Sequence, residues 1–287
     1  AAWVMGKVRG TSGSESLAAA ANIFIGQTEA PLVIKPYLAT MTRSELMALM
    51  TGGMATIAGG VLAAYVAFGI SAGHLLTASV ISAPAALMMA KILLPEGEVS
   101  PTREGANARV KKHTVNGIDA LCQGASEGMR LAINVMAMLI AFVAGVALLN
   151  HLLALLFGLF GAAEDKPLQL ILGWVQAPFA WLMGIPAADC LQAGSILGER
   201  LVLNEFIGYM SLSQHAETLS PRTVTVLTYA LCGFANFSSI AIQIGGIGAL
   251  AETRRGDLAQ IGLRAMVGGA LACYTTACIA SLLSSGA

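Results

Sequence analysis

At residues 26–31 the chain reads Gly26-Gln27-Thr28-Glu29-Ala30-Pro31, and this stretch decides the fold. Alanine-rich sequence precedes it and Leu32-Val33-Ile34 follows it, yet it carries an amide, a hydroxyl and a carboxylate. Gly26 and Pro31 would interrupt any helix that ran through it. Because the mean hydropathy of the chain is +0.73, we interpret the stretch as a helix break at membrane depth. An ionisable residue in such a place indicates a functional site.

The composition indicates a polytopic membrane protein. Of 287 residues, 56% are hydrophobic and only 11% are charged, whereas soluble domains are about a quarter charged. The formal net charge is 0, which offers no electrostatic footprint for nucleic acid, so we expect no nucleic-acid partner. The five cysteines lack CxxC spacing, and we expect them to be small apolar side chains instead of metal ligands or disulfides.

The apolar segments on either side of residues 26–31 are too short to cross a bilayer. Residues 17–40 contain two arms of roughly ten residues, whereas a crossing helix needs about 20. We therefore predict a re-entrant helical hairpin with residues 26–31 near its tip. The polar residues 1–16 are expected to form a surface helix and turn.

The next two segments, residues 44–70 and 75–94, are long enough to cross. Gly52-Gly53 and Gly59-Gly60 bracket Thr56, which predicts that the first of these helices is unwound midway. The small residues have an alternative interpretation as a face for helix packing.

A second set of segments repeats this plan. Residues 168–213 contain apolar arms, Pro178 and Pro186, and a polar interruption from Gly198 to Phe206. Residues 219–250 form another crossing with a polar middle, Gly233-Phe234-Ala235-Asn236-Phe237-Ser238-Ser239. A hairpin with an acidic tip, followed by a broken crossing helix, is thus predicted twice.

Charge placement orients the two repeats. Residues 118–160 are predicted to form an amphipathic segment leading into a long apolar helix, and residues 262–284 the last span. If hairpins return to their side of entry, all of the 16 Lys and Arg residues except Lys166, Arg200 and Arg222 lie toward one side. The positive-inside rule makes that side cytoplasmic. The hairpins then enter from opposite sides, so we predict an all-α polytopic fold with an inverted repeat, as in secondary transporters.

Two carboxylates, Glu29 and Glu205, lie at the predicted hairpin tips. An ionised, unpaired carboxylate is costly in a membrane, so each needs a cation, a proton or a donor. The vicinal hydroxyls of a polyol can form a two-pronged hydrogen bond with one carboxylate, and Asn236 and Ser239, three residues apart, could orient the same molecule. The alternative is that each acid pairs with Arg or Lys inside the bundle, for which Arg200 is the candidate near Glu205.

Neighbouring side chains suit a ring and a cation. Gln27 and Thr28 offer donors and acceptors for the edge of a planar heterocycle, and Phe234 offers apolar surface. A hard cation such as Na⁺ could bind where the break from Asn22 to Ile25 faces Thr56-Ile57, because unwound carbonyls supply oxygen ligands. The alternative is that the Thr56 hydroxyl only bonds its own helix backbone.

Three motifs in this order resemble the concentrative nucleoside transporters, namely Gly26-Gln27-Thr28-Glu29-Ala30-Pro31, Asn204-Glu205-Phe206 and Gly233-Phe234-Ala235-Asn236-Phe237-Ser238-Ser239-Ile240. The resemblance covers essentially the whole chain. It implies the first half of a transport domain at 1–94, a loop, amphipathic helix and long scaffold helix at 95–160, and the second half of the transport domain at 161–287. The family's N-terminal scaffold helices are absent from this sequence, so we expect an upstream part.

The resemblance also implies roles for individual residues. Three would contact the nucleobase, some of them through water: Gln27, Thr28 and Glu29. Val61 would line the base pocket. The residues that would hold the ribose are Glu205, Asn236 and Ser239. Phe234 would pack beside the ligand. Four would form the sodium site: Asn22, Ile25, Thr56 and Ile57.

The implied function is the uptake of a uridine-like nucleoside across the lipid bilayer of the bacterial inner membrane. The resemblance implies a homotrimer, an inward sodium gradient as the driving force, and an elevator motion of the transport domain against a scaffold. Some relatives use H⁺, so a proton-coupled carrier with Glu29 or Glu205 as proton acceptor is an alternative. Arg200 stands where Lys is usual, and base preference stays open.

Two alternatives belong to other classes. An integral-membrane enzyme would need a nucleophile or metal constellation, and the sequence shows none, so we do not expect an enzyme. A structural membrane protein would not need two acids at hairpin tips.

Overall fold

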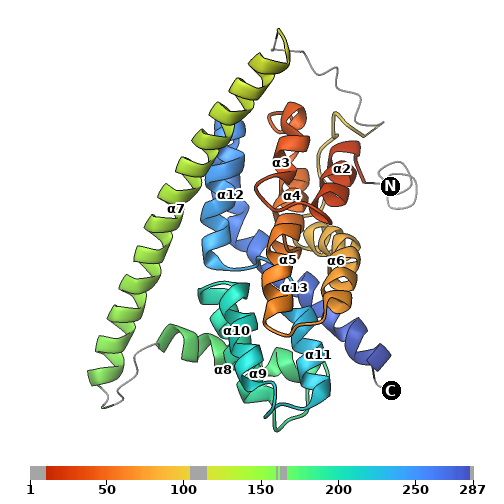
Figure 1. Cartoon of the computed structure of the whole chain (residues 1–287). Coiled ribbons are helices and arrows are strands. Elements are labelled where there is room, and N and C mark those ends of the chain that lie inside the picture. The colour runs from red at the N-terminus through yellow and green to blue at the C-terminus, as the bar shows by residue number, and fades with distance from the viewer. Residues whose placement is uncertain (1–10, 104–114, 160, 162–166, 285–287) are drawn as a thin grey trace.

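The computed structural model describes residues 11–103, 115–159, 161 and 167–284, and within these ranges the chain is helical without a strand. The elements in chain order are α2 (Gly13–Asn22), α3 (Ala30–Val33), the 3₁₀ turn η1 (Lys35–Tyr37), α4 (Arg43–Ala55), α5 (Gly59–Ala67), α6 (Ala72–Leu93), α7 (Gly117–Leu159), α8 (Pro167–Leu182), α9 (Cys190–Val202), α10 (Glu205–His215), α11 (Pro221–Ala230), α12 (Phe237–Leu250), η2 (Glu252–Arg254) and α13 (Arg255–Leu283). Figure 1 shows α2 and α3 at one end of the molecule and α9 and α10 at the other. The fold of the described residues is thus all-α, as predicted from the sequence.

The first hairpin turns at the stretch that breaks the apolar pattern. Helix α2 begins with a reciprocal capping box, in which Ser12 accepts from the Glu15 amide and the Glu15 carboxylate accepts from the Ser12 amide. Such a box satisfies two of the amide donors that a helix start leaves open. Helix α2 ends at Asn22, and the next helix, α3, begins at Ala30. The turn packs against the first unwound helix, because a Cβ added to Gly26 would lie 3.0 Å from the Ala58 Cβ.

The expectation that residues 1–16 form a surface segment is wrong for the part that the structure describes. Glu15 is only 2% exposed, and its carboxylate pairs with the Lys91 ammonium of α6. Ser14 donates a 3.1 Å hydrogen bond to Glu45 of α4, which is also buried. These polar side chains satisfy one another inside the fold, as buried polar groups must, and hydropathy alone does not reveal that pairing.

The first crossing helix is unwound where the glycines predict it. Helix α4 ends at Ala55, Thr56 is extended, and α5 begins at Gly59. The packing interpretation of the glycines also holds, since a Cβ on Gly53 would lie 2.8 Å from the Gln243 Nε2. Three stretches of the described residues are long and apolar enough to cross a membrane: Arg43–Ala67, Ala72–Leu93 and Glu252–Leu283.

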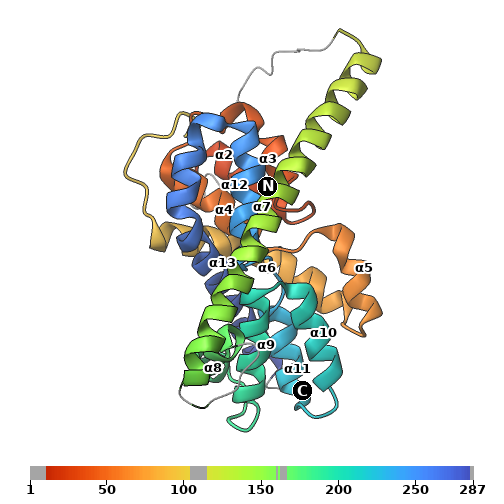
Figure 2. The ribbon, with the colours of Figure 1, turned by 90° about the vertical axis from the view of Figure 1, so that its left-hand side faces the viewer.

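Helix α7 is one continuous helix of 43 residues, where the sequence predicts an amphipathic segment leading into an apolar helix. Figures 1 and 2 show it running along the outside of the other helices, beside α12. Most of its described side chains are exposed. It therefore flanks the core instead of contributing to it.

The second hairpin has different arms from those predicted over 168–213. The structure divides this range into three helices, and Pro178 lies inside α8. The arms are α9 and α10, joined through Leu203 and Asn204. Helix α8 packs closely on α9, since a Cβ on Gly194 would lie 2.5 Å from the Gly173 carbonyl oxygen. Small residues allow such backbone contact between membrane helices.

The two unwound segments meet in the middle of the molecule. The second segment runs from Leu231 to Asn236, between α11 and α12. A Cβ on Gly233 would lie 2.7 Å from the Met54 carbonyl oxygen, at the end of α4. The predicted order of hairpin and broken helix thus occurs twice, with the breaks in contact. This contact positions the candidate site.

Candidate functional site

A cavity of about 420 Å³ lies where the first hairpin, the second hairpin, the second break and α7 come together. Its residues are Gln27, Val143, Val146, Val202, Leu203, Asn204, Glu205, Ile207, Phe234, Asn236, Ser238, Ser239 and Ile242. Apolar walls with a few convergent polar groups are typical of small-molecule sites. The cavity unites five of the eight residues that the resemblance assigns to the nucleoside: Gln27, Glu205, Phe234, Asn236 and Ser239.

Glu205 is the acid of this cavity and is only 4% exposed. It is the first residue of α10, after Asn204, whose side chain caps the helix by accepting from the Ile207 amide at 3.0 Å. The Tyr65 hydroxyl donates to Glu205 Oε1 at 2.8 Å, and the Asn236 amide nitrogen lies 3.5 Å from Oε2. Because the second distance is at the limit for a hydrogen bond, Oε2 keeps most of its capacity to accept from a ligand.

The alternative pairing of Glu205 with Arg200 does not occur among the ion pairs of the described residues. Arg200 is fully buried and donates instead to the Gly233 carbonyl oxygen, at 3.4 Å from Nε and 3.3 Å from Nη2. It also lies 3.4 Å from the Cys273 sulfur. Its guanidinium therefore supports the unwound backbone between α11 and α12 from behind the cavity.

A chain of amides joins the first hairpin to the second break. Asn236 caps α12 by accepting from the Ser239 amide at 2.8 Å. The Ser239 hydroxyl accepts from Gln27 Nε2 at 3.1 Å, and Gln27 Oε1 accepts from Gln243 Nε2 at 2.9 Å. Gln243 also donates to the Met50 carbonyl at 3.1 Å. Gln27 is thus held at the cavity wall from two sides.

Three of the residues assigned to the nucleoside do not line this cavity. Thr28 and Val61 are half-buried, and Glu29 is exposed at the start of α3. The expectation that both hairpin acids lie in a buried environment therefore describes Glu205 and not Glu29. Contact of Thr28, Glu29 and Val61 with a base stays a prediction.

The candidate cation residues lie close together. A Cβ on Gly52 would lie 2.9 Å from the Asn22 Nδ2, so the end of α2 touches the end of α4. Asn22 is 1% exposed, and neither polar atom of its side chain has a hydrogen-bond partner among the described residues. The Thr56 hydroxyl donates to the Gly52 carbonyl at 3.0 Å, as its alternative interpretation predicts, but its oxygen can still accept. Ile57 is buried and Ile25 half-buried.

These residues fit a sodium ion better than a transition metal. The oxygen of a buried, unpartnered amide side chain is the kind of ligand that a hard cation takes. Within the described residues, no group of three or more His, Cys, Asp or Glu side chains could hold a metal. Four of the five cysteines are at least partly buried and all are free.

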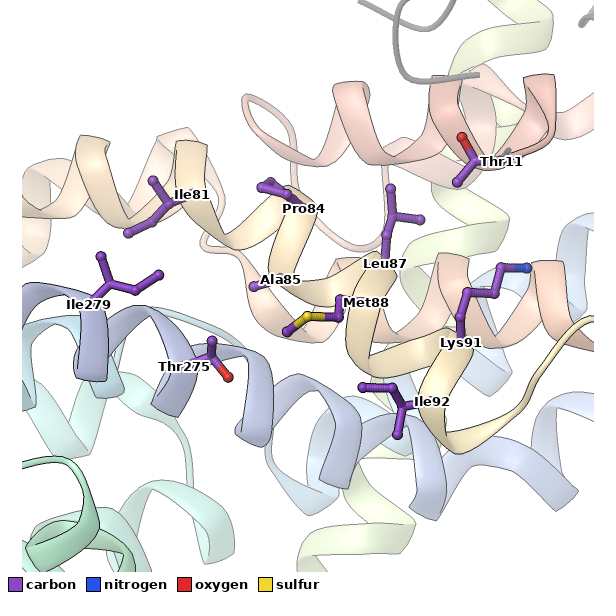
Figure 3. A pocket seen from close by; sticks show the side chains of 10 residues that line it. All are labelled: Thr11, Ile81, Pro84, Ala85, Leu87, Met88, Lys91, Ile92, Thr275 and Ile279. Atoms are coloured by element: carbon purple, nitrogen blue, oxygen red, sulfur yellow. The ribbon is translucent and has the colours of Figure 1, made fainter. Parts of the chain in front are cut away.

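A larger cavity of about 740 Å³ lies elsewhere, between α6 and α13. Figure 3 shows its wall, in which Ile81, Pro84, Leu87, Met88 and Ile92 are apolar. Among the described residues, the polar side chains that line it are Thr11, Lys91 and Thr275. A polyol would find too few partners there, so the smaller cavity around Glu205 is the better candidate.

The sequence did not predict Tyr65 or Gln243 as site residues. Tyr65 lies 140 positions from Glu205 and Gln243 lies 216 from Gln27. Each residue is polar within an apolar helix, which is the one signal that could have drawn attention to it.

An all-helical membrane protein with two hairpins and two broken helices around a polar cavity has the architecture of a secondary transporter. The chain belongs to the concentrative nucleoside transporter family. A family profile described as the C-terminus of Na⁺-dependent nucleoside transporters matches residues 74–281, and one described as nucleoside recognition matches residues 1–72.

Relatives and solved structures agree with this membership. The chain is 48% identical to the transporter YutK of Bacillus subtilis (strain 168), over 97% of this chain and 69% of YutK. It is 43% identical to mouse sodium/nucleoside cotransporter 1, over 98% of this chain and 46% of that protein.

Two solved structures give the comparison of shape. CNTnw in an inward-facing substrate-bound state is 43% identical, with a TM-score of 0.81 over 100% of this chain and 68% of that chain. A CNTnw variant in an outward-facing state is 42% identical, with a TM-score of 0.89 over 99% and 68%. The family and these neighbours are transporters, not enzymes.

Proposed function

We propose that the protein takes up nucleosides in symport with sodium. The observation that carries this proposal is the buried Glu205 carboxylate, which faces a cavity with one oxygen available and with amide and hydroxyl groups beside it. The names of the family profile and of the mouse relative support the substrate and the ion. The chain spans less than half of that relative and 69% of YutK, so the activity of a whole transporter is part of the proposal.

The site chemistry suits a nucleoside because each part of the ligand has a partner. The two ribose hydroxyls would donate to Glu205, a charge-assisted arrangement that is stronger than a neutral one. Asn236 and Ser239 would take the remaining donors and acceptors of the sugar. The base would meet the Gln27 amide and the ring of Phe234, whereas Thr28, Glu29 and Val61 would reach the base only after a change in the hairpin.

Sodium would bind at Asn22 and Thr56, with carbonyls of the unwound segments around Ile25 and Ile57. The neutral oxygens of an amide, a hydroxyl and carbonyls match what a hard cation accepts. By ordering the first hairpin against the break, the ion would present Gln27 to the base. Ion and nucleoside affinities would then rise together, because coupling between sites is reciprocal.

Alternating access would come from an elevator motion of the two transport halves, 1–94 and 161–287, against α7 and the rest of a scaffold. The closer resemblance to the outward-facing neighbour than to the inward-facing one supports an outward-like state. We further propose a homotrimer in the bacterial inner membrane.

Uptake of radiolabelled uridine by the full-length protein in proteoliposomes tests the function. We expect saturable uptake with an inward sodium gradient and none with choline in its place. Uptake driven by a proton gradient alone would replace the ion and keep the substrate. Absence of saturable uptake of uridine and of purine nucleosides under both gradients would contradict the proposal.

The variant Thr56→Val tests the sodium ligands separately. It keeps the shape of the side chain and removes the oxygen, so the sodium concentration for half-maximal uptake should rise on the order of tenfold, with little change in the maximal rate. Thr51→Val is the matched control, because Thr51 is also a fully buried threonine and lies in α4, one turn before the unwound segment. Equal sodium dependence of the two variants would remove Thr56 from the site.

A further inference from the structure

Tyr65 contacts the candidate site without lining the cavity. Its side chain is 0% exposed, and its hydroxyl donates the 2.8 Å hydrogen bond to Glu205 Oε1. A hydroxyl that donates to a carboxylate forms one of the stronger hydrogen bonds of proteins, because the acceptor carries charge. Tyr65 therefore fixes the orientation of the carboxylate that would hold the ribose.

The C-terminal end of α5 makes further contacts with α10, the helix that begins with Glu205. The Tyr65 ring lies 4.5 Å from the Tyr209 ring of α10, between centroids. The Phe68 ring, at the end of α5, lies 5.1 Å from the Phe206 ring in an edge-to-face contact. The Ser213 hydroxyl donates to the Phe68 carbonyl at 2.8 Å. Figure 2 shows α5 standing beside α10 at the edge of the molecule. Three contacts besides the hydroxyl thus hold α5 to the second hairpin.

The opposite end of α5 lies at the proposed sodium site. Helix α5 begins at Gly59, directly after the unwound residues Thr56, Ile57 and Ala58. A Cβ on Gly59 would lie 3.1 Å from the Phe24 carbonyl oxygen, so this end also touches the turn of the first hairpin. Helix α5 has nine residues at about 1.5 Å each along its axis, so it connects the unwound segment to Tyr65 over a short distance.

We infer that Tyr65 transmits sodium binding at the first break to Glu205 and so couples the cation to the nucleoside. The inference rests on the proposed function. In it, the ordered break places α5 so that the hydroxyl holds Glu205 Oε1 and leaves Oε2 turned toward the sugar. Neither set of ligands includes Tyr65, so loss of its hydroxyl leaves both sites in place and removes the connection between them. Tyr65 is a positioning residue.

The test compares Tyr65→Phe with Tyr209→Phe in the full-length protein. Tyr209 is a matched control because it is also fully buried, stacks on the Tyr65 ring, and donates a 2.8 Å hydrogen bond, but to the Thr228 backbone carbonyl. The Kd of uridine is measured in sodium chloride and in choline chloride, and the ratio of the two values gives the coupling. The sodium-induced rise in melting temperature, measured without nucleoside, reports the sodium site alone.

We expect the Kd ratio to fall by at least about fivefold in Tyr65→Phe, within the usual range of coupling between sites, and to stay at the wild-type value in Tyr209→Phe. The sodium-induced rise in melting temperature should persist in both variants. A wild-type ratio in Tyr65→Phe would overturn the relay and leave the proposed function intact. Loss of the sodium effect on melting in Tyr65→Phe would also overturn it, by making Tyr65 part of the sodium site. A wild-type protein that binds no uridine would overturn the relay together with the proposed function.

Discussion

Sodium-driven uridine uptake should fall by about 100-fold or more when Glu205 is replaced by glutamine. A hydrogen bond to a charged group contributes about 1.5–3 kcal/mol, and the two ribose hydroxyls would lose the charge of their shared acceptor. The glutamine also presents an amide donor where the carboxylate offers only acceptors, so one sugar hydroxyl would face a donor inside a buried site. The loss should appear in kcat/KM for uptake, measured in proteoliposomes under an inward sodium gradient.

The control for this variant is Glu217→Gln. Glu217 is an exposed acid after α10 and does not line the cavity, so its neutralisation should leave uptake unchanged. Equal amounts of folded protein in both preparations, checked by gel filtration, separate a binding effect from a folding effect. Uptake by Glu205→Gln within a few-fold of wild type would show that the ribose does not bind at this carboxylate.

Replacing Gly233 by alanine should lower the melting temperature by several degrees and abolish transport. The new methyl group would lie 2.7 Å from the Met54 carbonyl oxygen, 2.9 Å from the Ala55 carbonyl carbon and 2.7 Å from the Cys273 sulfur. Two of these atoms are backbone and cannot turn away. Overpacking of a well-filled interior typically costs about 1–3 kcal/mol. Because this contact joins the two unwound segments, the strain would fall on the residues that form the site.

Gly60→Ala is the matched control for the glycine variant. Gly60 lies in α5, and a Cβ added there would meet nothing within 4 Å. Alanine in a helix is intrinsically more favourable than glycine by about 0.5–1 kcal/mol, so this variant should melt at or above the wild-type temperature. A Gly233→Ala protein that melts with the wild type would contradict the close approach of the two breaks.

The order of the elements could be predicted because breaks have local causes. Polar side chains and helix-breaking residues such as Gly26 and Pro31 stand out in an apolar sequence, and segments of about ten residues cannot cross a bilayer. The caps that end the second hairpin turn and the second break, Asn204 and Asn236, were not predicted, although Asn is a favoured N-terminal helix cap. Family resemblance added the roles of the residues between them.

The arms of the second hairpin were predicted less well, because a local pattern does not show how two helices pack against each other. The sequence pattern groups α8 with the hairpin because it is also apolar, and Pro178 does not end that helix. The backbone contact between Gly173 and Gly194 is a property of two helices together, which a single-sequence pattern does not record.

The sequence by itself determined that this chain is a membrane protein with two acidic hairpins and two broken helices, because hydropathy, glycine, proline and polar residues act within a few positions. Only the tertiary structure decided that Glu205 faces a cavity and Glu29 does not, that Arg200 supports a carbonyl instead of pairing with the acid, and that Tyr65 holds the carboxylate. Those outcomes depend on contacts between residues far apart in the chain. Which partner a buried polar group finds is set by the packing of whole helices.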